Sequence, residues 1–169
     1  AKLPVAEDDT VAAWELHRAA KSRLEAIPGV HLLQSSVDAL IVESGAVDGV
    51  ETWEGVPRRA GRVALCVGPF LRARLTVGAA TERAGRPGEM AYDELVDDLA
   101  ARSIGLAASR DRGGGDGRPA WTRAYLRLAP TEMDGARVPR LAGLYAAGAC
   151  VHGDMDYASA AADGATLAA

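Results

Sequence analysis

Two short apolar runs that each end in a glycine constrain the fold of this chain more than any other feature. Gly68 follows the run Arg62–Val67, and Gly148 follows the run Leu144–Ala147. Continuous apolar runs of this length are typical of strands buried on both faces of an α/β sheet. Such sheets bind ligands at the carboxyl ends of their strands, where a glycine lets the ligand approach the backbone. The sequence therefore predicts an α/β fold with a ligand site at these two glycines.

The segment after Gly148 carries residue types that suit a nucleotide site. Asp154 could accept hydrogen bonds from a chain of hydroxyl groups, and Tyr157 begins a predicted helix that continues to Ala169. The start of a helix offers free N–H groups and a positive dipole end to a pyrophosphate. An ordinary strand–turn–helix with a capping aspartate is the alternative. We expect the small residues of this helix to lie close to the sheet, namely Ala158, Ala161, Ala162 and Ala165.

The rest of the chain is predicted to form short helices and strands. Apolar residues at helical spacing predict helices over Val11–Ile27 and Ala91–Ile104, with Asp93 among the solvated acids of the second. Val30–Gln34 is expected to be a strand parallel to the two glycine-terminated runs. The glycine-rich segment Asp111–Arg118 is expected to be a mobile loop. Further strands are expected at Thr122–Ala129, Asp38–Glu43, Ala46–Trp53 and Pro57–Gly61.

Composition and charge exclude several classes of protein. The net charge of −4 argues against a general nucleic-acid binder, whose binding face would make the chain basic. No apolar run approaches the roughly 18 residues that a membrane-spanning helix needs, so we expect no membrane association. Cys66 and Cys150 have no CxxC partner, which argues against a zinc site or a disulfide framework. A reducing, cytoplasmic location fits this cysteine usage.

The order of these motifs resembles the glucose-inhibited division protein A family of tRNA-modifying flavoproteins. That family's pattern is a helix, a Val-Asp-Leu-Ile-Val meander, VGTFL, and finally GLxxAG…GY..AAA..G. The matching segments here are Val11–Ile27, Val37–Val42, Val67–Leu71, Gly143–Gly148 and Tyr157–Gly164. The resemblance covers most of the chain.

The resemblance implies an FAD/NAD(P)-binding, Rossmann-like three-layer fold with FAD as its cofactor. The backbone of Val37 would touch the adenine end of FAD, and Gly68 would pass near the cofactor. Gly148 would lie against the pyrophosphate, and Asp154 would lie toward the ribityl chain. Tyr157 would stand at the start of the last helix. We expect one FAD-binding domain over residues 1–169, with the antiparallel meander at residues 37–61 as an insertion.

Departures from the family pattern limit what the resemblance implies. The GxGxxG fingerprint is missing, so we expect the domain to be incomplete at its N-terminus. The family's Lys-Thr-Gly-Thr-Pro-Pro run is replaced by Asp111–Arg118, and a glycine after VGTFL is replaced by Ala73. The long middle domain and the helical C-terminal domain of the tRNA enzyme have no counterpart here. This chain therefore gives no support for tRNA binding.

The expected function is that of an FAD-dependent oxidoreductase with an unknown small-molecule or RNA substrate. The alternative is a non-catalytic remnant or interaction protein that keeps the fold without FAD. Among the histidines, His152 lies in the candidate FAD loop, whereas His17 and His31 are expected to be structural or solvated. Cys66 is expected to be a buried strand residue. Cys150 could lie near the flavin, although a small buried residue is the simpler interpretation.

Overall fold

The computed structural model describes residues 13–115 and 117–167 of the chain, which divides into two units at Ser35/Ser36. The described part of the first unit is α1 (Ala13–Glu25) followed by chain without regular structure. The helix predicted over Val11–Ile27 is confirmed from Ala13 to Glu25, whereas Ala26 and Ile27 are not helical and Val11 lies outside the described residues.

The strand predicted at Val30–Gln34 is wrong. This segment forms no strand, and Val30, Leu32 and Leu33 are exposed. A short apolar run has no periodicity that distinguishes a strand from other extended chain, and a strand also needs a neighbour to pair with. The expected parallel sheet therefore lacks this member.

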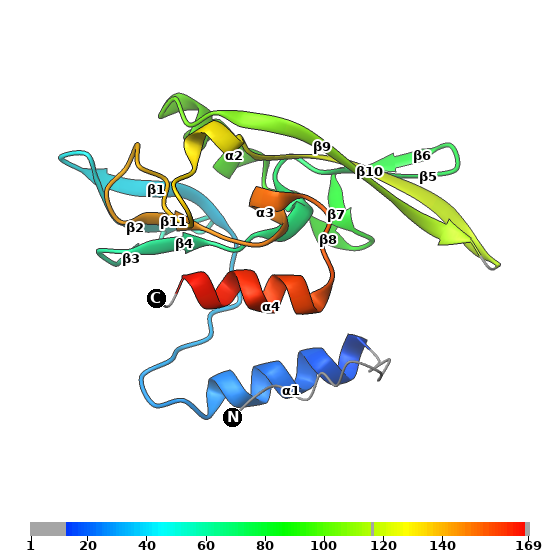
Figure 1. Cartoon of the computed structure of the whole chain (residues 1–169), viewed down its shortest axis with the longest axis horizontal. Coiled ribbons are helices and arrows are strands. Elements are labelled where there is room, and N and C mark those ends of the chain that lie inside the picture. Colours follow the sequence, from blue (N-terminus) through cyan, green and yellow to red (C-terminus); the bar gives the residue numbers. More distant parts are fainter. Residues whose placement is uncertain (1–12, 116, 168–169) are drawn as a thin grey trace. The chain divides into compact units, whose positions relative to one another are not determined.

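The second unit begins with the predicted antiparallel meander. Its strands are β1 (Val37–Glu43), β2 (Ala46–Thr52) and β3 (Pro57–Arg59), in the order β1-β2-β3 (Figure 1). The turn at Ser44 and Gly45 has positive φ at both positions, as a two-residue hairpin of this hand requires. The three strands predicted here are confirmed within one or two residues at their ends.

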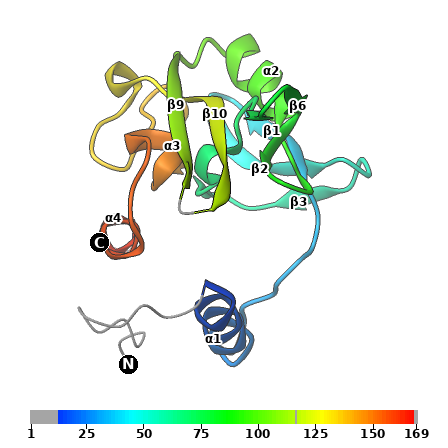
Figure 2. The same cartoon turned by 90° about the vertical axis from the view of Figure 1, so that its right-hand side faces the viewer.

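A long hairpin dominates the second sheet, whose order is β6-β5-β10-β9. Its strands β9 (Leu106–Gly115) and β10 (Arg118–Leu128) run side by side, and β5 (Arg74–Val77) and β6 (Ala80–Glu82) continue the sheet (Figures 1 and 2). The mobile loop predicted at Asp111–Arg118 is therefore wrong, whereas the strand predicted at Thr122–Ala129 lies within β10 except for its last residue.

The glycines of the hairpin serve close packing rather than mobility. A Cβ on Gly113 would lie 2.5 Å from the Trp121 ring, and one on Gly114 would lie 2.2 Å from the carbonyl oxygen of Pro119. Only glycine leaves room for such contacts, since real Cβ atoms do not approach heavy atoms this closely. The glycine-rich composition thus has a packing cause that the sequence does not reveal.

The two glycine-terminated runs do form a parallel pair. They are β4 (Val63–Leu65) and β11 (Leu144–Ala146), with Leu144 opposite Val63. A single 3₁₀ turn, η1 (Gly68–Phe70), follows β4, and the short helix α3 (Ala149–His152) follows β11. Burial on both faces is not observed for β4, because Ala64 is exposed. The arrangement is mixed α/β.

The helix α2 (Asp93–Ala101) covers the meander and closes the core. Its Asp98 accepts a hydrogen bond from the backbone N–H of Leu40 at 3.0 Å, and Arg102 donates to the Leu40 carbonyl at 2.6 Å. The helix buries an apolar face made of Leu95, Val96 and Leu99. The core also contains Leu40, Val47, Leu65, Leu71, Ile104, Leu128, Val138, Leu144 and Cys150.

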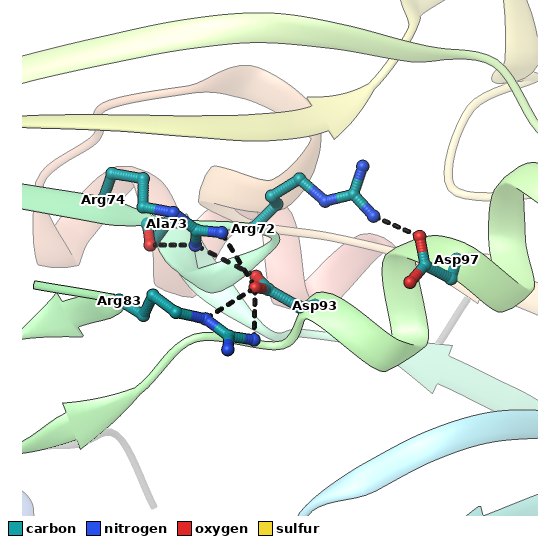
Figure 3. A network of polar contacts seen from close by, with 6 residues as sticks. All are labelled: Arg72, Ala73, Arg74, Arg83, Asp93 and Asp97. Atoms are coloured by element: carbon teal, nitrogen blue, oxygen red, sulfur yellow. Dashed lines mark hydrogen bonds and ion pairs between the residues drawn. The ribbon is translucent and has the colours of Figure 1, made fainter.

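Asp93 is not solvated as predicted but fastens α2 to the second sheet. Its carboxylate accepts hydrogen bonds from Arg74 at 2.8 and 3.1 Å and from Arg83 at 2.9 Å (Figure 3). Arg72 pairs separately with Asp97 in the same view. The two guanidinium groups satisfy the carboxylate and let Asp93 be buried. Arg83 stands just before β7 (Ala84–Arg86), which pairs with β8 (Glu89–Met90).

The last helix, α4 (Tyr157–Thr166), lies outside the sheets (Figure 2) and buries none of its residues. The prediction that its small residues would lie against the sheet is wrong, because Ala158, Ala161, Ala162 and Ala165 are exposed. Asp156 caps its N-terminus by accepting a hydrogen bond from the Ser159 N–H at 2.7 Å. Between β10 and β11 the chain forms one further 3₁₀ turn, η2 (Pro130–Glu132).

Candidate functional site

The carboxyl ends of β4 and β11 open into a cavity of about 860 Å³. One side consists of the segments that follow these strands and the loop before α4, and the other consists of β5, β7 and the β9–β10 hairpin. Small-molecule sites are concave and mostly apolar, with volumes of roughly 300–1,000 Å³. The lining residues include Cys66, Gly68, Pro69, Leu75, Val77, Gly85, Arg86, Asp111, Trp121, Arg123, Gly148, Asp154, Asp156, Tyr157, Ala160 and Gly164.

Four of the five residues predicted to contact a cofactor line this cavity. They come from two segments that are far apart in the sequence: Gly68 follows β4, and Gly148, Asp154 and Tyr157 follow β11. Val37, the fifth, is not among the lining residues. It begins β1 opposite Thr52 and packs against the hydrophobic core. The structure therefore brings four of the predicted residues together and leaves Val37 apart.

Gly148 occupies a backbone conformation that favours glycine, with φ 81° and ψ −156°. A Cβ built on it would meet no atom within 4 Å, so open space lies beside the glycine. Its N–H donates a hydrogen bond to the Asp163 carboxylate, and the other oxygen of that carboxylate lies 3.0 Å from His152 Nε2. A side chain of α4 thus bonds to the amide that the sequence pattern assigns to a pyrophosphate.

The N-terminus of α4 is closed by the chain itself. The hydrogen bond from the Ser159 N–H holds the pKa of Asp156 below its ordinary value. This geometry matches the capping aspartate that was the alternative interpretation of the segment. Asp154 has no such hydrogen bond within the described residues, is exposed and lines the cavity, so its carboxylate is open to a ligand hydroxyl.

A buried charged cluster forms the hairpin side of the cavity. The guanidinium group of Arg123 pairs with Asp111 and donates to the Gly85 carbonyl at 2.8 Å. Tyr125 donates to the second oxygen of Asp111 at 3.1 Å, and burial raises the pKa of its hydroxyl. Sequence reasoning missed this cluster because it treated Asp111 as part of a loop. The one available signal in the sequence was the position of Asp111 between Arg110 and Arg112. This alternation is typical of a strand, and the two arginines are exposed while Asp111 is buried.

Trp121 gives this wall an aromatic surface. Its ring lies over Gly113, and the guanidinium carbon of Arg123 is 5.4 Å from the ring centroid. Trp14 and Trp53 are far more exposed, at 61% and 64%, and neither lines the cavity. The half-buried Trp121 is therefore the one tryptophan positioned to contact a molecule in this cavity.

The two cysteines occupy different environments, and only that of Cys150 agrees with the sequence-based expectation. Cys66 is exposed and lines the cavity, so the prediction that it is buried is wrong. The residue lies just beyond the end of β4, where the backbone turns toward Gly68. Cys150 is buried, and burial raises the pKa of its thiol to about 11. Its Sγ lies within hydrogen-bond distance of the carbonyl oxygens of Leu65 and Ala147, to which its one proton can donate, which is a structural role.

The three histidines, His17, His31 and His152, are all among the described residues. His17 and His31 are exposed in the first unit, whereas His152 is exposed beside the cavity segment and contacts Asp163. The part of the chain that the structure describes holds no group of three or more His, Cys, Asp or Glu side chains that could bind a metal. Across the same residues, the helices are too short or too polar to cross a membrane.

Comparison with known proteins agrees with this architecture. Residues 9–114 match the family model described as glucose inhibited division protein A. The tRNA uridine 5-carboxymethylaminomethyl modification enzyme MnmG of Geobacter metallireducens is 36% identical over 112 residues. That match spans 64% of this chain and only 17% of the enzyme. The chain is thus similar to a small part of a much longer protein.

Two solved structures share the fold. The GidA-related protein from Thermus thermophilus is 36% identical, with a TM-score of 0.85 over 96% of this chain and 71% of that protein. Aquifex aeolicus GidA superimposes with a TM-score of 0.81 over 90% of this chain and 48% of that protein, at 15% identity. The second likeness concerns the fold alone. Together with the family match over more than half of its residues, these comparisons show that the chain belongs to the glucose inhibited division protein A family.

Proposed function

We propose that this chain is a flavoprotein that binds FAD in the 860 Å³ cavity. The observation that carries the proposal is the convergence of Gly68, Gly148, Asp154 and Tyr157 on one cavity. The family resemblance assigns these residues to the FAD site, and they come from the two strand ends, the loop before α4 and the first residue of α4. Gly68 is far in sequence from the other three, and the parallel pairing of β4 with β11 brings these two segments to the same cavity.

The chemistry of the lining fits the parts of FAD. Pro69, Leu75, Val77 and Trp121 would enclose the flat isoalloxazine ring, and Asp154 would accept hydrogen bonds from the ribityl hydroxyls. The open space beside Gly148 would admit the diphosphate close to the backbone, although the Gly148 N–H is already bonded to Asp163. The contact of Val37 with the adenine end rests on the family resemblance alone.

The proposal includes a finer description of the fold. We assign β4 and β11 to a Rossmann-like, three-layer FAD/NAD(P)-binding arrangement, in which residues 1–169 form one domain and residues 37–61 are an inserted meander. The parallel pairing of Leu144 with Val63 and the glycine after each strand support this assignment.

The proposed reaction class is oxidoreduction of a small-molecule or RNA substrate that is not yet identified. When bound, the flavin would supply the electron transfer. The chain's own residues would bind and orient the flavin. Trp121 would cover the ring, and the ion pair of Arg123 with Asp111 would form a rigid, electrically neutral side of the cavity. Since the chain spans 17% of the Geobacter enzyme, binding of tRNA is not part of the proposal.

Flavin content tests the proposal. The protein is purified, freed of bound nucleotide, and titrated with FAD while flavin absorbance and tryptophan emission are followed. Saturable binding of one FAD per chain, with a shifted flavin spectrum, is the expected result. A protein that binds no flavin at concentrations up to about 1 mM would overturn the proposal, since that limit is a free energy of only about −4 kcal/mol.

One specific observation favours the second candidate, a relative that keeps the fold without FAD. Asp163 bonds to the Gly148 amide, and Asp156 caps α4, so both nearby donors are satisfied by the chain's own carboxylates. Under this alternative the titration gives no flavin binding, and the cavity serves an interaction that involves no cofactor.

A further inference from the structure

The carboxylate of Asp163 is bonded to the backbone of Gly148, one of the residues that line the cavity. One of its oxygens accepts a hydrogen bond from the Gly148 N–H, and the other contacts His152. Ala160 and Gly164, on the same helix, line the cavity. The side chain of Asp163 is only 18% exposed, so its bond to Gly148 is partly buried, whereas its contact with the 53% exposed His152 lies at the surface.

A carboxylate and a phosphate compete for the same kind of donor. Both are anions that accept strong, charge-assisted hydrogen bonds from backbone N–H groups. An anion brought to Gly148 would therefore have to replace Asp163, and it would also meet the negative charge of that residue at short range. Like charges placed side by side disfavour binding. Asp163 thus opposes an anion at this amide both by occupying the donor and by its charge.

The helix that carries Asp163 is weakly attached to the rest of its unit. α4 buries none of its residues, and its exposed alanines contribute little apolar burial. The hydrogen bonds of Asp163 to Gly148 and His152 are therefore among the principal contacts that hold this helix to the cavity. Elements with few buried apolar contacts move at low free-energy cost.

We infer that Asp163 is a specificity-determining residue, which competes with the diphosphate of the ligand for the Gly148 amide and must be displaced before that diphosphate binds. For FAD the inference rests on the proposed function. The competition itself concerns any ligand with a diphosphate group, because the disputed donor is a backbone N–H. A ligand without phosphate does not need this donor and escapes the competition.

The test compares three probes on the full chain. FAD carries both the flavin and the diphosphate, riboflavin carries the flavin without phosphate, and ADP carries the diphosphate without flavin. Affinities are measured by isothermal titration calorimetry for the wild type, for Asp163→Asn and for Asp163→Ala. Asp97→Asn removes the same charge from α2, outside the cavity, and is the matched control. Thermal melts show that each variant folds.

Asp163→Asn should tighten FAD and ADP by about five- to tenfold, because a neutral hydrogen bond is weaker than a charge-assisted one and the repulsion is gone. The riboflavin affinity of the Asp163 variants should stay within about twofold of the wild-type value. The same holds for the affinities of the Asp97→Asn protein for all three probes. Tightening of ADP without any flavin binding would support the inference and overturn the FAD proposal.

Several results would overturn the inference. Unchanged or weaker FAD and ADP binding in both folded Asp163 variants would show that the carboxylate only fastens α4. Equal tightening of riboflavin, FAD and ADP would show an effect on cavity shape rather than competition with an anion. Absence of binding by all three probes to every variant would remove both the inference and the proposed function.

Discussion

Asp111 and Arg123 face each other directly across the β9–β10 hairpin, and their ion pair is buried in the wall of the cavity. Only 3% of the Asp111 side chain and 10% of the Arg123 side chain are exposed. Arg123 also bonds to Gly85, so the pair links the hairpin to β7. The shape of the cavity on this side therefore depends on one pair of opposite charges.

Replacing Asp111 by Ala should destabilise the protein by about 3–5 kcal/mol, because Arg123 would be left as a buried charge without its partner. Urea unfolding measures the change. The double variant Asp111→Leu/Arg123→Met, which removes both charges, should recover much of the loss. Glu43→Gln, which alters an exposed pair with Arg59, should leave the unfolding midpoint nearly unchanged. A similarly small change for Asp111→Ala would show that the pair contributes little.

The network of Asp93 predicts a pH dependence of stability. Arg74, and to a lesser extent Arg83, hold the pKa of Asp93 below its ordinary value of 3.8. Since the folded-state pKa is below the unfolded one, this contribution is present above about pH 4 and is lost as the pH falls through the folded-state pKa. Asp93→Asn should therefore cost about 1–2 kcal/mol at pH 7, and its difference from wild type should shrink as the pH falls below about 4 and Asp93 becomes protonated.

The matched control for Asp93 is its exposed neighbour in the first turn of α2, Glu94. Glu94→Gln removes the same charge from the same end of the helix but breaks none of the hydrogen bonds to Arg74 and Arg83. Denaturant unfolding between pH 2 and pH 7 compares the two variants. Equal effects of both substitutions at every pH would show that the helix dipole, and not the ion pairs, carries the contribution.

Much of the fold could be predicted where the sequence signal is local. Ser44-Gly45 marked the hairpin turn, and the runs before Gly68 and Gly148 indicated the parallel strands that the structure contains. The gathering of cavity residues followed from the rule that ligands bind at strand ends. These features depend on a few neighbouring residues and on one general rule of sheet topology.

The errors concern residues whose environment is set by distant partners. Asp93 is predicted to be solvated because nothing in the sequence of α2 indicates that two arginines bind its carboxylate. One of these arginines lies in β5 and the other just before β7. Gly113 and Gly114 looked mobile because the ring of Trp121 and the carbonyl of Pro119 lie across the hairpin. Val30–Gln34 is apolar but gains no strand partner. Such contacts are properties of the three-dimensional fold rather than of any short segment.

Gly148→Val should reduce FAD affinity strongly and also lower stability by about 1–3 kcal/mol. The stability cost comes from the backbone, since φ is 81° there and a β-branched residue is strained in that region. The loss of binding comes from filling the open space beside the glycine. Gly78→Val is the control: it has φ 58° and open surroundings but does not line the cavity. Equal FAD binding by both variants would make Gly148 a turn glycine only.

Trp121 should report the bound flavin. FAD is expected to quench tryptophan emission in the wild type, because a flavin ring in the cavity would lie near Trp121. Trp121→Phe should abolish most of this quenching, whereas Trp53→Phe, at an exposed position outside the cavity, should leave it intact. The reverse pattern, with quenching lost in Trp53→Phe, would place the flavin elsewhere on the protein.

Hydrogen–deuterium exchange with and without FAD tests most directly whether the cavity is the flavin site. The account predicts that FAD slows amide exchange in residues 66–69 and 147–157, which follow β4 and β11, and leaves exchange in β3 (Pro57–Arg59) unchanged. Slower exchange at Val37 would add the adenine contact that the family resemblance implies. Binding of FAD with no protection in residues 66–69 and 147–157, or no binding at all, would contradict the account.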